Sequence, residues 1–588
     1  MIEVIARGGP GRIVKWSRGE TRLETPNILF FSSEAHPAPT FAQLIIRMNE
    51  NGRREITDPS NRRLIEFPAQ DHIKPSLSWL SMTGDGFSLA FEDTTIVRAA
   101  PNQITEYCKE IENSSTEIVS LEGAFELRRS ARMLVESIVS LREAIGPSKL
   151  IYLPGIMDPS NLAILVYLGV DLFDSSLLIY SSQIGRLCLP EGSLPADQVS
   201  WLQLGDTCEP ILKFNLESAW RELQLVKLMM KQGRLREFVE LRANANPWAV
   251  AALRILDLEF YEYQEKYTPV VGQRILCNSK ESLYRPDVWR YRRRILERYK
   301  PPSNKRVLLL LPCSAKKPYS FSRTHRIFEN IITSIENWRV VHQVIVTSPL
   351  GLVPRELELF YPAAHYDVPV TGHWDLEETS IVVEMIRSLA AHNYVAIVCH
   401  LGEGMNFVSE NIDCLNTSVG SPISRESLEN LRKELTRICD GLPHVSKEED
   451  RLCEMKSIAR FQFGEGGEIL LDGCEVLGKY PYLKIMEGDK QVAILTPERG
   501  MLSLTLRGAE KIIPIGRNWV EIEDFVLKGN LFVAGIKDAD KSLRIGDEVV
   551  VLKSGSLKAV GIASMCGEEM VRCKRGEAVK IRHLTPDQ

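Results

Sequence analysis

Short apolar runs alternate with amphipathic segments along the first 265 residues of the chain. Apolar positions at helical spacing predict helices over residues 130–145, 161–168, 215–243 with a break at Gly233, and 247–263. Apolar runs bounded by turn residues predict strands over 150–153 and 170–173. This order is typical of an α/β barrel or another parallel-sheet fold. We therefore expect a TIM-barrel-like domain over residues 1–265.

A second alternation of strands and helices follows over residues 266–445. It predicts strands over 307–311, 343–347, 366–370 and 394–399, and helices over 326–338 and 377–391. Such an order favours a doubly wound α/β domain, in which ligands bind beyond the carboxyl ends of the strands. Cys313, Ser348 and His400 each follow a predicted strand and are expected at that edge.

The remaining residues predict two smaller domains. Residues 446–508 form a mixed segment with two or three strands, read as a small α+β domain. Residues 509–588 alternate strands and turns, the pattern of a small β-barrel. The fold class expected for the whole chain is therefore α/β, with a β-barrel at its C-terminus.

Composition limits the class of protein. The 588 residues are 44% hydrophobic, and the twelve cysteines include no Cys-x-x-Cys pair, which favours reduced thiols in the cytoplasm over a disulfide scaffold. No apolar run has the length of a membrane span, and no N-terminal leader is recognisable, so we expect a soluble cytoplasmic protein.

The net charge of −5 gives no general sign of nucleic-acid binding, so such a function would depend on local basic segments. Two are found, and each is either a phosphate-contacting surface or only a solvated face. Their candidate RNA-binding residues are Arg292 and Arg293 in the first, and Arg572, Lys574, Arg575, Lys580 and Arg582 in the second.

Candidate chemistry is concentrated in the loop over residues 312–325, between a buried strand and a helix. The candidate catalytic residues are Cys313, Lys316, Tyr319, Ser322 and His325. A helix N-terminus and nearby lysine or histidine side chains favour the thiolate of a cysteine, so Cys313 is the expected nucleophile. The alternative is a structural or phosphate-gripping turn. A lone histidine such as His400 is more often structural than catalytic.

Several stretches resemble known families. Residues 24–26, 152–159, 169–174 and 215–239 resemble tRNA-guanine transglycosylases, and residues 532–535, 545–549 and 579–583 resemble the PUA domain, a small RNA-binding barrel. The motif over residues 312–325 resembles the signature of the archaeosine synthase family.

The resemblance implies an enzyme of archaeosine biosynthesis in an archaeon. Such an enzyme joins the side-chain amine of free lysine to the nitrile of 7-cyano-7-deazaguanine in the tRNA D-arm, and a radical-SAM partner then cleaves the adduct. No cofactor is expected, and the sequence leaves a homodimer open. Cys313 could add to the nitrile and form a thioimidate, or it could orient the nitrile for direct attack by the amine. The other readings are a base-exchanging transglycosylase and a non-catalytic tRNA-binding adaptor.

The chain also departs from the transglycosylase pattern. Asp174 falls where those enzymes keep their carboxylate nucleophile, and Asp85 is displaced by one position from their general base. Both are expected to contact substrate, with Ser348 and His400, and the alternative for Asp174 is a purely structural carboxylate. The zinc site is reduced to Cys208, with Phe214 in place of a histidine, so no metal is expected because zinc needs about four ligands. Apolar packing around Leu202, Leu204, Ile211 and Phe214 should hold that region instead.

Overall fold

The computed structural model describes residues 2–33, 36–48, 54–67, 89–90, 94–98, 116–122, 124–199, 202 and 207–586. Asp85 and Leu204 lie outside these ranges. The chain divides into two compact units. Unit 1 contains residues 1–268, 532–534 and 565–578, and unit 2 contains residues 269–531, 535–564 and 579–588.

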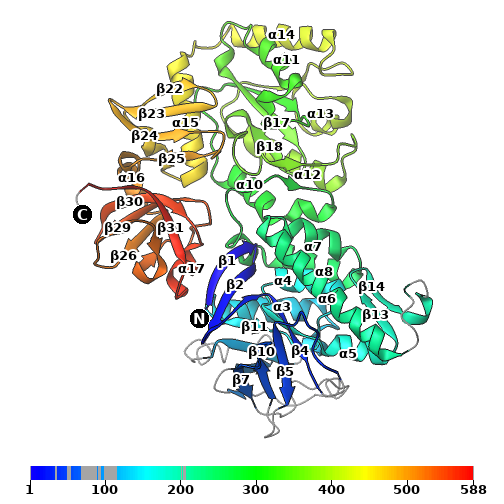
Figure 1. The fold of residues 1–588 in the computed structure, drawn as a ribbon. Coiled ribbons are helices and arrows are strands. Elements are labelled where there is room, and N and C mark those ends of the chain that lie inside the picture. Colours follow the sequence, from blue (N-terminus) through cyan, green and yellow to red (C-terminus); the bar gives the residue numbers. More distant parts are fainter. Residues whose placement is uncertain are drawn as a thin grey trace. The chain divides into compact units, whose positions relative to one another are not determined.

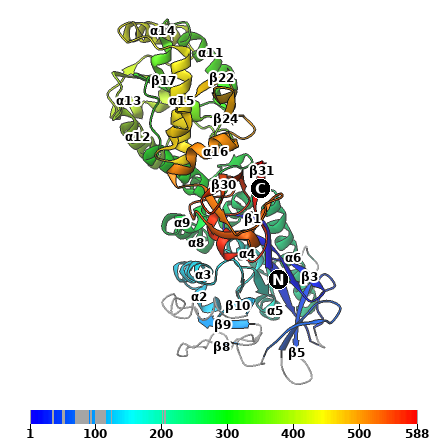
Figure 2. The same ribbon diagram turned by 90° about the vertical axis from the view of Figure 1, so that its left-hand side faces the viewer.

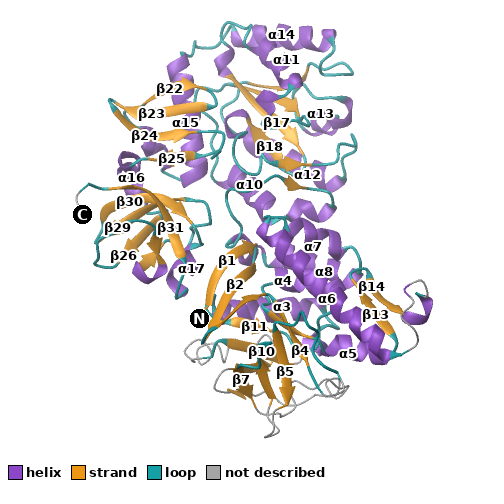
Figure 3. Cartoon of the chain, viewed as in Figure 1, coloured by secondary structure: helices purple, strands orange, loops and turns teal. Residues whose placement is uncertain are grey.

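The sheet at the centre of unit 1 is mainly parallel (Figures 1 and 3). Its strand order is β7-β6-β5-β4-β12-β11-β10-β9-β8, and the neighbouring pairs from β5 to β9 are parallel. The strands are β4 (Asn27–Phe31), β5 (Leu44–Met48), β6 (Arg54–Thr57), β7 (Arg63–Phe67), β8 (Leu89–Ala90), β9 (Thr94–Arg98), β10 (Ile118–Glu122), β11 (Leu150–Tyr152) and β12 (Leu172–Asp174).

The expected barrel is only partly seen. Within the described ranges the strand order ends at β7 on one side and at β8 on the other, and no pairing joins these two ends. The sheet is extended at both ends by antiparallel pairs, which are β5 with β6 and β7, and β9 with β8. Unit 1 is therefore a mixed α/β fold with a parallel centre.

Helices and small antiparallel sheets complete unit 1. The helices are α2 (Ala124–Leu127), α3 (Ala131–Ile145), α4 (Pro159–Tyr167), α5 (Ser176–Gln183), α6 (Cys208–Lys231), α7 (Leu235–Ala243), α8 (Pro247–Glu259), α9 (Tyr261–Glu265) and α17 (Gly567–Arg572). The small sheets are β1 (Ile2–Gly8), β2 (Gly11–Arg18) and β3 (Thr21–Thr25), and the hairpin β13 (Arg186–Leu189) and β14 (Gly192–Pro195). Gly233 has a φ of +66° between α6 and α7, so the helix breaks where the sequence predicts it.

Apolar packing holds the region where transglycosylases bind zinc. Leu187, Val199 and Ile211 form a small buried cluster, and Leu202 and Phe214 pack against it. Cys208 is exposed. Within the described ranges, no group of three or more metal-binding side chains is found.

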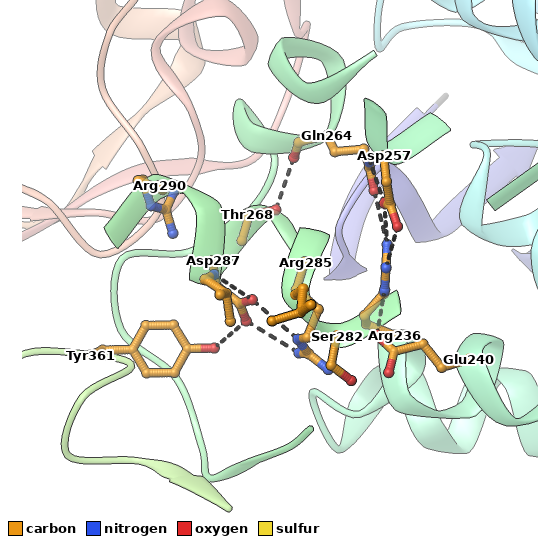
Figure 4. A network of polar contacts seen from close by, with 12 residues as sticks. Arg236, Glu240, Asp257, Gln264, Thr268, Ser282, Arg285, Asp287, Arg290 and Tyr361 are labelled. Carbon is orange, nitrogen blue, oxygen red and sulfur yellow. Dashed lines mark hydrogen bonds and ion pairs between the residues drawn. The ribbon is translucent and has the colours of Figure 1, made fainter. Parts of the chain in front are cut away.

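Each unit also contains a buried polar cluster (Figure 4). In unit 1, Arg236 donates two hydrogen bonds of 2.6 Å to the Asp257 carboxylate, and Gln264 donates to the same side chain over 3.0 Å. In unit 2, Asp287 accepts from Arg285 over 3.1 Å and from the Tyr361 hydroxyl over 2.8 Å. Hydrogen bonds of this kind offset part of the large cost of burying charges.

The main sheet of unit 2 is mostly parallel (Figure 1). Its order is β18-β17-β16-β20-β21, and all pairs are parallel except β17 with β18. The strands are β16 (Val307–Pro312), β17 (Val341–Thr347), β18 (Gly351–Pro354), β20 (Ala396–Cys399) and β21 (Leu415–Asn416). β16 is buried over Val307–Leu311, as its continuous apolar run requires.

The helices around this sheet are α10 (Pro286–Glu297), α11 (Arg323–Ile332), α12 (Leu376–Ala390), α13 (Phe407–Asn411) and α14 (Arg425–Cys439). A short parallel pair joins β15 (Ile275–Leu276) to β19 (Tyr366–Asp367). The helix predicted over 326–338 begins three residues earlier and ends at Ile332.

The rest of unit 2 contains two further groups. The first consists of helix α15 (Lys447–Phe463), a four-stranded sheet and helix α16 (Leu506–Ile512). The strands of this sheet are β22 (Glu475–Lys479), β23 (Tyr482–Glu487), β24 (Lys490–Leu495) and β25 (Leu502–Leu504). Helix α15 contacts β22 (Figure 2). The second is a β-sheet with the order β27-β31-β30-β29-β26-β28. Its strands are β26 (Trp519–Ile522), β28 (Ile536–Ala539), β29 (Glu548–Lys553), β30 (Ser556–Ala563) and β31 (Glu577–Leu584), with β27 (Leu531–Phe532) between β26 and β28 along the chain. No described helix combines the length and apolar character needed to cross a membrane.

Candidate functional site

The Cys313 loop leaves the carboxyl end of β16. Cys313 follows the last residue of that strand and is half-buried, whereas Lys316 at the tip of the loop is exposed. The Ser314 hydroxyl donates to the carbonyl oxygen of Lys316 over 3.1 Å, which shapes the turn. Of the two adjacent lysines, Lys317 is the one that turns inward, and its Nζ lies 3.9 Å from the ring centroid of Tyr366.

Hydroxyl groups from three elements meet beside the thiol. The Tyr366 hydroxyl is in short hydrogen bonds with the hydroxyls of Tyr319 and Thr347, and all three side chains are buried. Thr347 ends β17, the strand next to β16, and its hydroxyl acts to lower the pKa of the Cys313 thiol. The parallel pairing of β16 with β17, the loop after β16 and the separate strand β19 together place a thiol, an amine and three hydroxyls in one small region.

The protonation state of Cys313 differs from the sequence expectation. Burial raises the pKa of the Cys313 thiol above its ordinary value, while the Thr347 hydrogen bond and the Lys317 charge act in the opposite direction without overcoming it. Burial also lowers the pKa of Lys317. The resting site therefore favours a thiol and weakens the charge of the neighbouring amine, instead of holding a preformed thiolate.

Ser322 and His325 begin α11. The Ser322 hydroxyl caps the helix by accepting from the backbone N–H of His325 over 3.1 Å. The His325 ring accepts at Nδ1 from Arg355 over 2.8 Å and lies 5.2 Å from the Tyr319 ring. Burial, helped by the Arg355 charge, lowers the pKa of His325 to about 3, so the ring is neutral at physiological pH.

A polar cavity of about 410 Å³ reaches this loop from the side of α15 and the β22–β23 hairpin. Ser320 and His325 line it, together with Arg355 and Glu358, whereas Cys313 is not in its lining. Glu358 is fully buried and accepts from the Ser320 backbone over 3.0 Å and from Arg355 over 2.9 Å. The cavity thus adjoins the motif without opening onto the thiol.

Ser348 and His400 follow strands of the same sheet edge, as the topology requires. Ser348 donates to Glu378 over 2.5 Å. His400 is fully buried, and its Nδ1 and Nε2 lie 2.9 Å from the Thr417 hydroxyl and 2.8 Å from the Pro422 carbonyl. Burial lowers the pKa of His400 to about 4. Both ring nitrogens are engaged in the protein, which is typical of a structural histidine.

Asp174 ends β12 in unit 1 and is fully buried. Its carboxylate accepts from the Tyr152 hydroxyl over 2.8 Å, from the Gly155 backbone over 2.9 Å, and from both the backbone and the hydroxyl of Ser176. Burial raises the pKa of Asp174, although these hydrogen bonds act to lower it. The carboxylate is held by four donors and has no exposed face.

The candidate RNA-binding residues differ in exposure. Arg572 donates to the backbone oxygens of Glu143 and Ala144 in unit 1, and Arg582 pairs with the buried Glu548 in unit 2. Arg292 is buried and donates to the Leu283 carbonyl, and Arg293 pairs with Glu297 over 3.2 Å. The exposed members of the C-terminal set are Lys574, Arg575 and Lys580.

Sequence reasoning missed part of the surroundings of the thiol. Thr347 immediately precedes Ser348 at the end of a strand. The expectation that sites form at the carboxyl ends of parallel strands could therefore have identified it. Tyr366 lies 53 positions after Cys313 in a two-residue strand that pairs with β15 instead of the main sheet, and no spacing signal marks it. Lys317 was visible as one of two adjacent lysines, but the sequence does not show which of them turns inward.

Comparison with known families assigns three regions of the chain. The family described as "Queuine tRNA-ribosyltransferase" matches residues 98–219, the PUA domain matches residues 520–585, and a domain of unknown function, DUF5591, matches residues 288–435. The DUF5591 region contains the Cys313 loop.

Similar proteins come from archaea. Archaeosine synthase subunit alpha of Methanosarcina acetivorans is 37% identical over 80% of this chain and 80% of its own length. Archaeosine synthase of Haloferax volcanii is 32% identical over 99% of each chain. A tRNA-guanine(15) transglycosylase of Methanothermobacter thermautotrophicus is 27% identical over 77% of this chain and 68% of its own.

Proposed function

The chain belongs to the archaeosine synthase family, and from this premise we propose that it joins the side-chain amine of free lysine to the nitrile carbon of 7-cyano-7-deazaguanine in the D-arm of tRNA. Family membership supports a tRNA-modifying transferase of archaeosine biosynthesis that carries a PUA domain. The lysine chemistry is our proposal. It rests on the amine of Lys317 and the three hydroxyl groups that lie near the Cys313 thiol.

The proposed reaction is covalent. The Cys313 sulfur adds to the electrophilic nitrile carbon, and the thiol proton passes to the nitrile nitrogen to give a thioimidate. The neutral lysine amine then adds to the same carbon. Collapse of that adduct forms the C–N bond of an amidine, breaks the C–S bond and returns the proton to sulfur. No oxidant, reductant or cofactor is needed, because every atom of both substrates is kept.

Three side chains support these proton movements. The thiol proton must reach the nitrile nitrogen as sulfur attacks, and we propose that the Lys317 amine beside Cys313, whose pKa burial lowers, relays it. The hydroxyls of Tyr319 and Thr347 can donate toward a developing imine nitrogen. Lys316 is exposed at the loop tip, the Ser322 hydroxyl caps α11, and the His325 ring accepts from Arg355, so we assign them no proton transfer.

The environment of Asp174 supports lysine addition over base exchange. A transglycosylase nucleophile must be presented to the ribose carbon, whereas Asp174 is fully buried and accepts four hydrogen bonds. We propose that Asp174 is a structural carboxylate, which orders the segment after β11. A non-catalytic adaptor would have no need of the Cys313 arrangement.

We further propose that tRNA phosphates contact Lys574, Arg575 and Lys580, which are exposed within the PUA match. A separate radical-SAM enzyme would then cleave the lysine adduct in the cytoplasm. Three relatives bear names that designate them subunit alpha, which fits a partner of this kind.

Mass spectrometry of tRNA tests the proposal. Transfer RNA carrying 7-cyano-7-deazaguanine is incubated with isotopically labelled lysine and wild-type protein, and the modified base should gain the mass of one lysine. Cys313→Ala should reduce the rate by several orders of magnitude, whereas Cys208→Ser, an exposed thiol in unit 1, should leave it unchanged. Wild-type protein without adduct would contradict the function. A Cys313→Ala rate within tenfold of wild type would remove the covalent step and favour direct attack.

A further inference from the structure

Two other cysteines meet at the sheet edge that contains the Cys313 loop. The Sγ atoms of Cys399 and Cys414 lie 2.7 Å apart, and neither is in a disulfide. A disulfide has a sulfur–sulfur distance of about 2.0 Å, so the two sulfur atoms are already close to bonding distance. Cys399 ends β20, and Cys414 immediately precedes β21, the parallel neighbour of β20.

We propose that Cys399 and Cys414 are a thiol modification site, at which a low-molecular-weight disulfide converts the pair into an intramolecular disulfide. The proposal is independent of the lysine chemistry. Adjacent strands set the backbone spacing, because Val398 pairs with Leu415 and Cys399 with Asn416. The two side chains therefore meet without movement of either strand.

The two thiols differ in accessibility and acidity, and these differences decide which of them reacts first with the disulfide reagent. Cys399 is 2% exposed, whereas Cys414 is half-buried. The close contact between the two sulfurs lowers the pKa of the Cys414 thiol and raises that of Cys399. Cys414 is thus the attacking thiol and Cys399 the resolving one.

The reaction is a pair of thiol–disulfide exchanges. The Cys414 thiolate attacks one sulfur of R–S–S–R, forms a mixed disulfide and expels R–S⁻, which takes up the proton that Cys414 released. The Cys399 sulfur then attacks the Cys414 sulfur, and the second R–S⁻ leaves with the proton from Cys399. The protein loses two protons and two electrons, and R–S–S–R is reduced to two R–SH.

The product would close a loop between residues 15 positions apart. That loop contains His400 and α13, and it lies beside the strand that leads to Cys313. Joining its ends restricts the unfolded chain, so the oxidised protein should melt several degrees higher than the reduced one.

Peptide mapping of the full-length protein tests the site. Reduced protein is treated with oxidised glutathione, free thiols are alkylated, and digestion should yield a cross-linked peptide pair containing Cys399 and Cys414. Ten of the twelve cysteines should remain alkylated, since two are consumed. Full alkylation of both residues, or a cross-link of either to another cysteine, would overturn the proposal.

Single variants separate the two roles. Cys399→Ser should trap glutathione on Cys414 as a stable mixed disulfide, whereas Cys414→Ser should leave Cys399 without an adduct. The control is Cys453→Ser, a half-buried thiol elsewhere in unit 2, which should still form the cross-link. Glutathione on Cys399 in the Cys414→Ser protein would reverse the assigned order. If either variant fails to fold, the wild-type map still decides whether the disulfide forms.

Discussion

Cys313 differs from most cysteine nucleophiles at the scale of the single residue, because its surroundings favour the neutral thiol. We expect iodoacetamide to alkylate Cys313 with a pH midpoint above that of an ordinary cysteine, since burial raises its pKa. Thr347→Val removes a hydrogen bond that lowers the pKa and should shift the midpoint further upward. Alkylation followed by peptide mapping measures this, with Cys208 as the exposed internal reference. A midpoint below that of Cys208 would contradict the burial argument.

His400 should make unit 2 sensitive to acid. Its folded pKa is about 4, below the roughly 6.5 of an unfolded histidine, so the unfolded chain binds more protons between these values. The stabilisation is fully present above pH 6.5 and is lost progressively as the pH falls toward 4, by about 2 kcal/mol at pH 5. Urea unfolding at pH 7.5 and 5.0 should show a smaller acid effect in His400→Gln than in wild type. The control His373→Gln changes an exposed ring and should behave as wild type.

At the scale of the element, Ser322 has a defined task at the start of α11. Ser322→Ala should lower the free energy of unfolding by about 1 kcal/mol because the backbone N–H of His325 loses its acceptor. Ser322→Asp keeps a cap and should retain the stability of wild type. Chemical denaturation measures both changes. Lysine transfer by the Asp variant gives a second readout: a stable but inactive protein would show that the hydroxyl itself takes part in the reaction.

Local signals explain which elements the sequence could predict. The buried run Val307–Leu311 and the break at Gly233 both depend on short-range preferences, and both are found where expected. The start of α11 was placed three residues late because Ser322 was assigned to the reactive loop instead of to a helix cap. α15 was not recognised, although Ser446 followed by Glu449 is the pattern of a capped N-terminus, and the Ser446 hydroxyl accepts from the backbone of Glu449.

The sequence does not predict which residues far apart along the chain meet in the folded protein. Strand order within a sheet brought Cys313 and Thr347 together as the alternation predicts, but Tyr366 reaches the thiol from a strand outside that sheet. The basic residues show the same limit. The cluster around Arg572 and Arg582 has the charge of an RNA-binding surface, yet only the folded chain shows that these two are engaged by Ala144 and Glu548.

At the scale of the whole molecule, α17 belongs to unit 1 although it lies near the C-terminus. Arg7 of β1 forms a buried ion pair with Glu569 of α17. Glu569→Gln should destabilise unit 1 by about 3 kcal/mol, because it leaves a buried guanidinium without its partner charge. Thermal or urea unfolding measures the effect.

Two matched variants make the test of this pair specific. Glu568→Gln, on the same helix but partly exposed, should cost much less. The double change Arg7→Met with Glu569→Leu should recover most of the loss, since no unpaired charge remains. Equal stability of Glu569→Gln and wild type would contradict the prediction.

Removing residues from about 510 onward also removes α17, so lost tRNA binding in that protein would not isolate the PUA domain. Lys574→Ala, Arg575→Ala and Lys580→Ala are the cleaner changes.

The pairing of Arg7 with Glu569 also determines when unit 1 can finish folding during synthesis on the ribosome. The two residues are 562 positions apart, so at about 5–20 residues per second roughly half a minute to two minutes separate their translation. During that interval the nascent N-terminal sheet has emerged while the helix that completes it has not been made. Vectorial folding can therefore assemble most of unit 1, but its final closure must wait until α17 has been translated and has emerged from the ribosome.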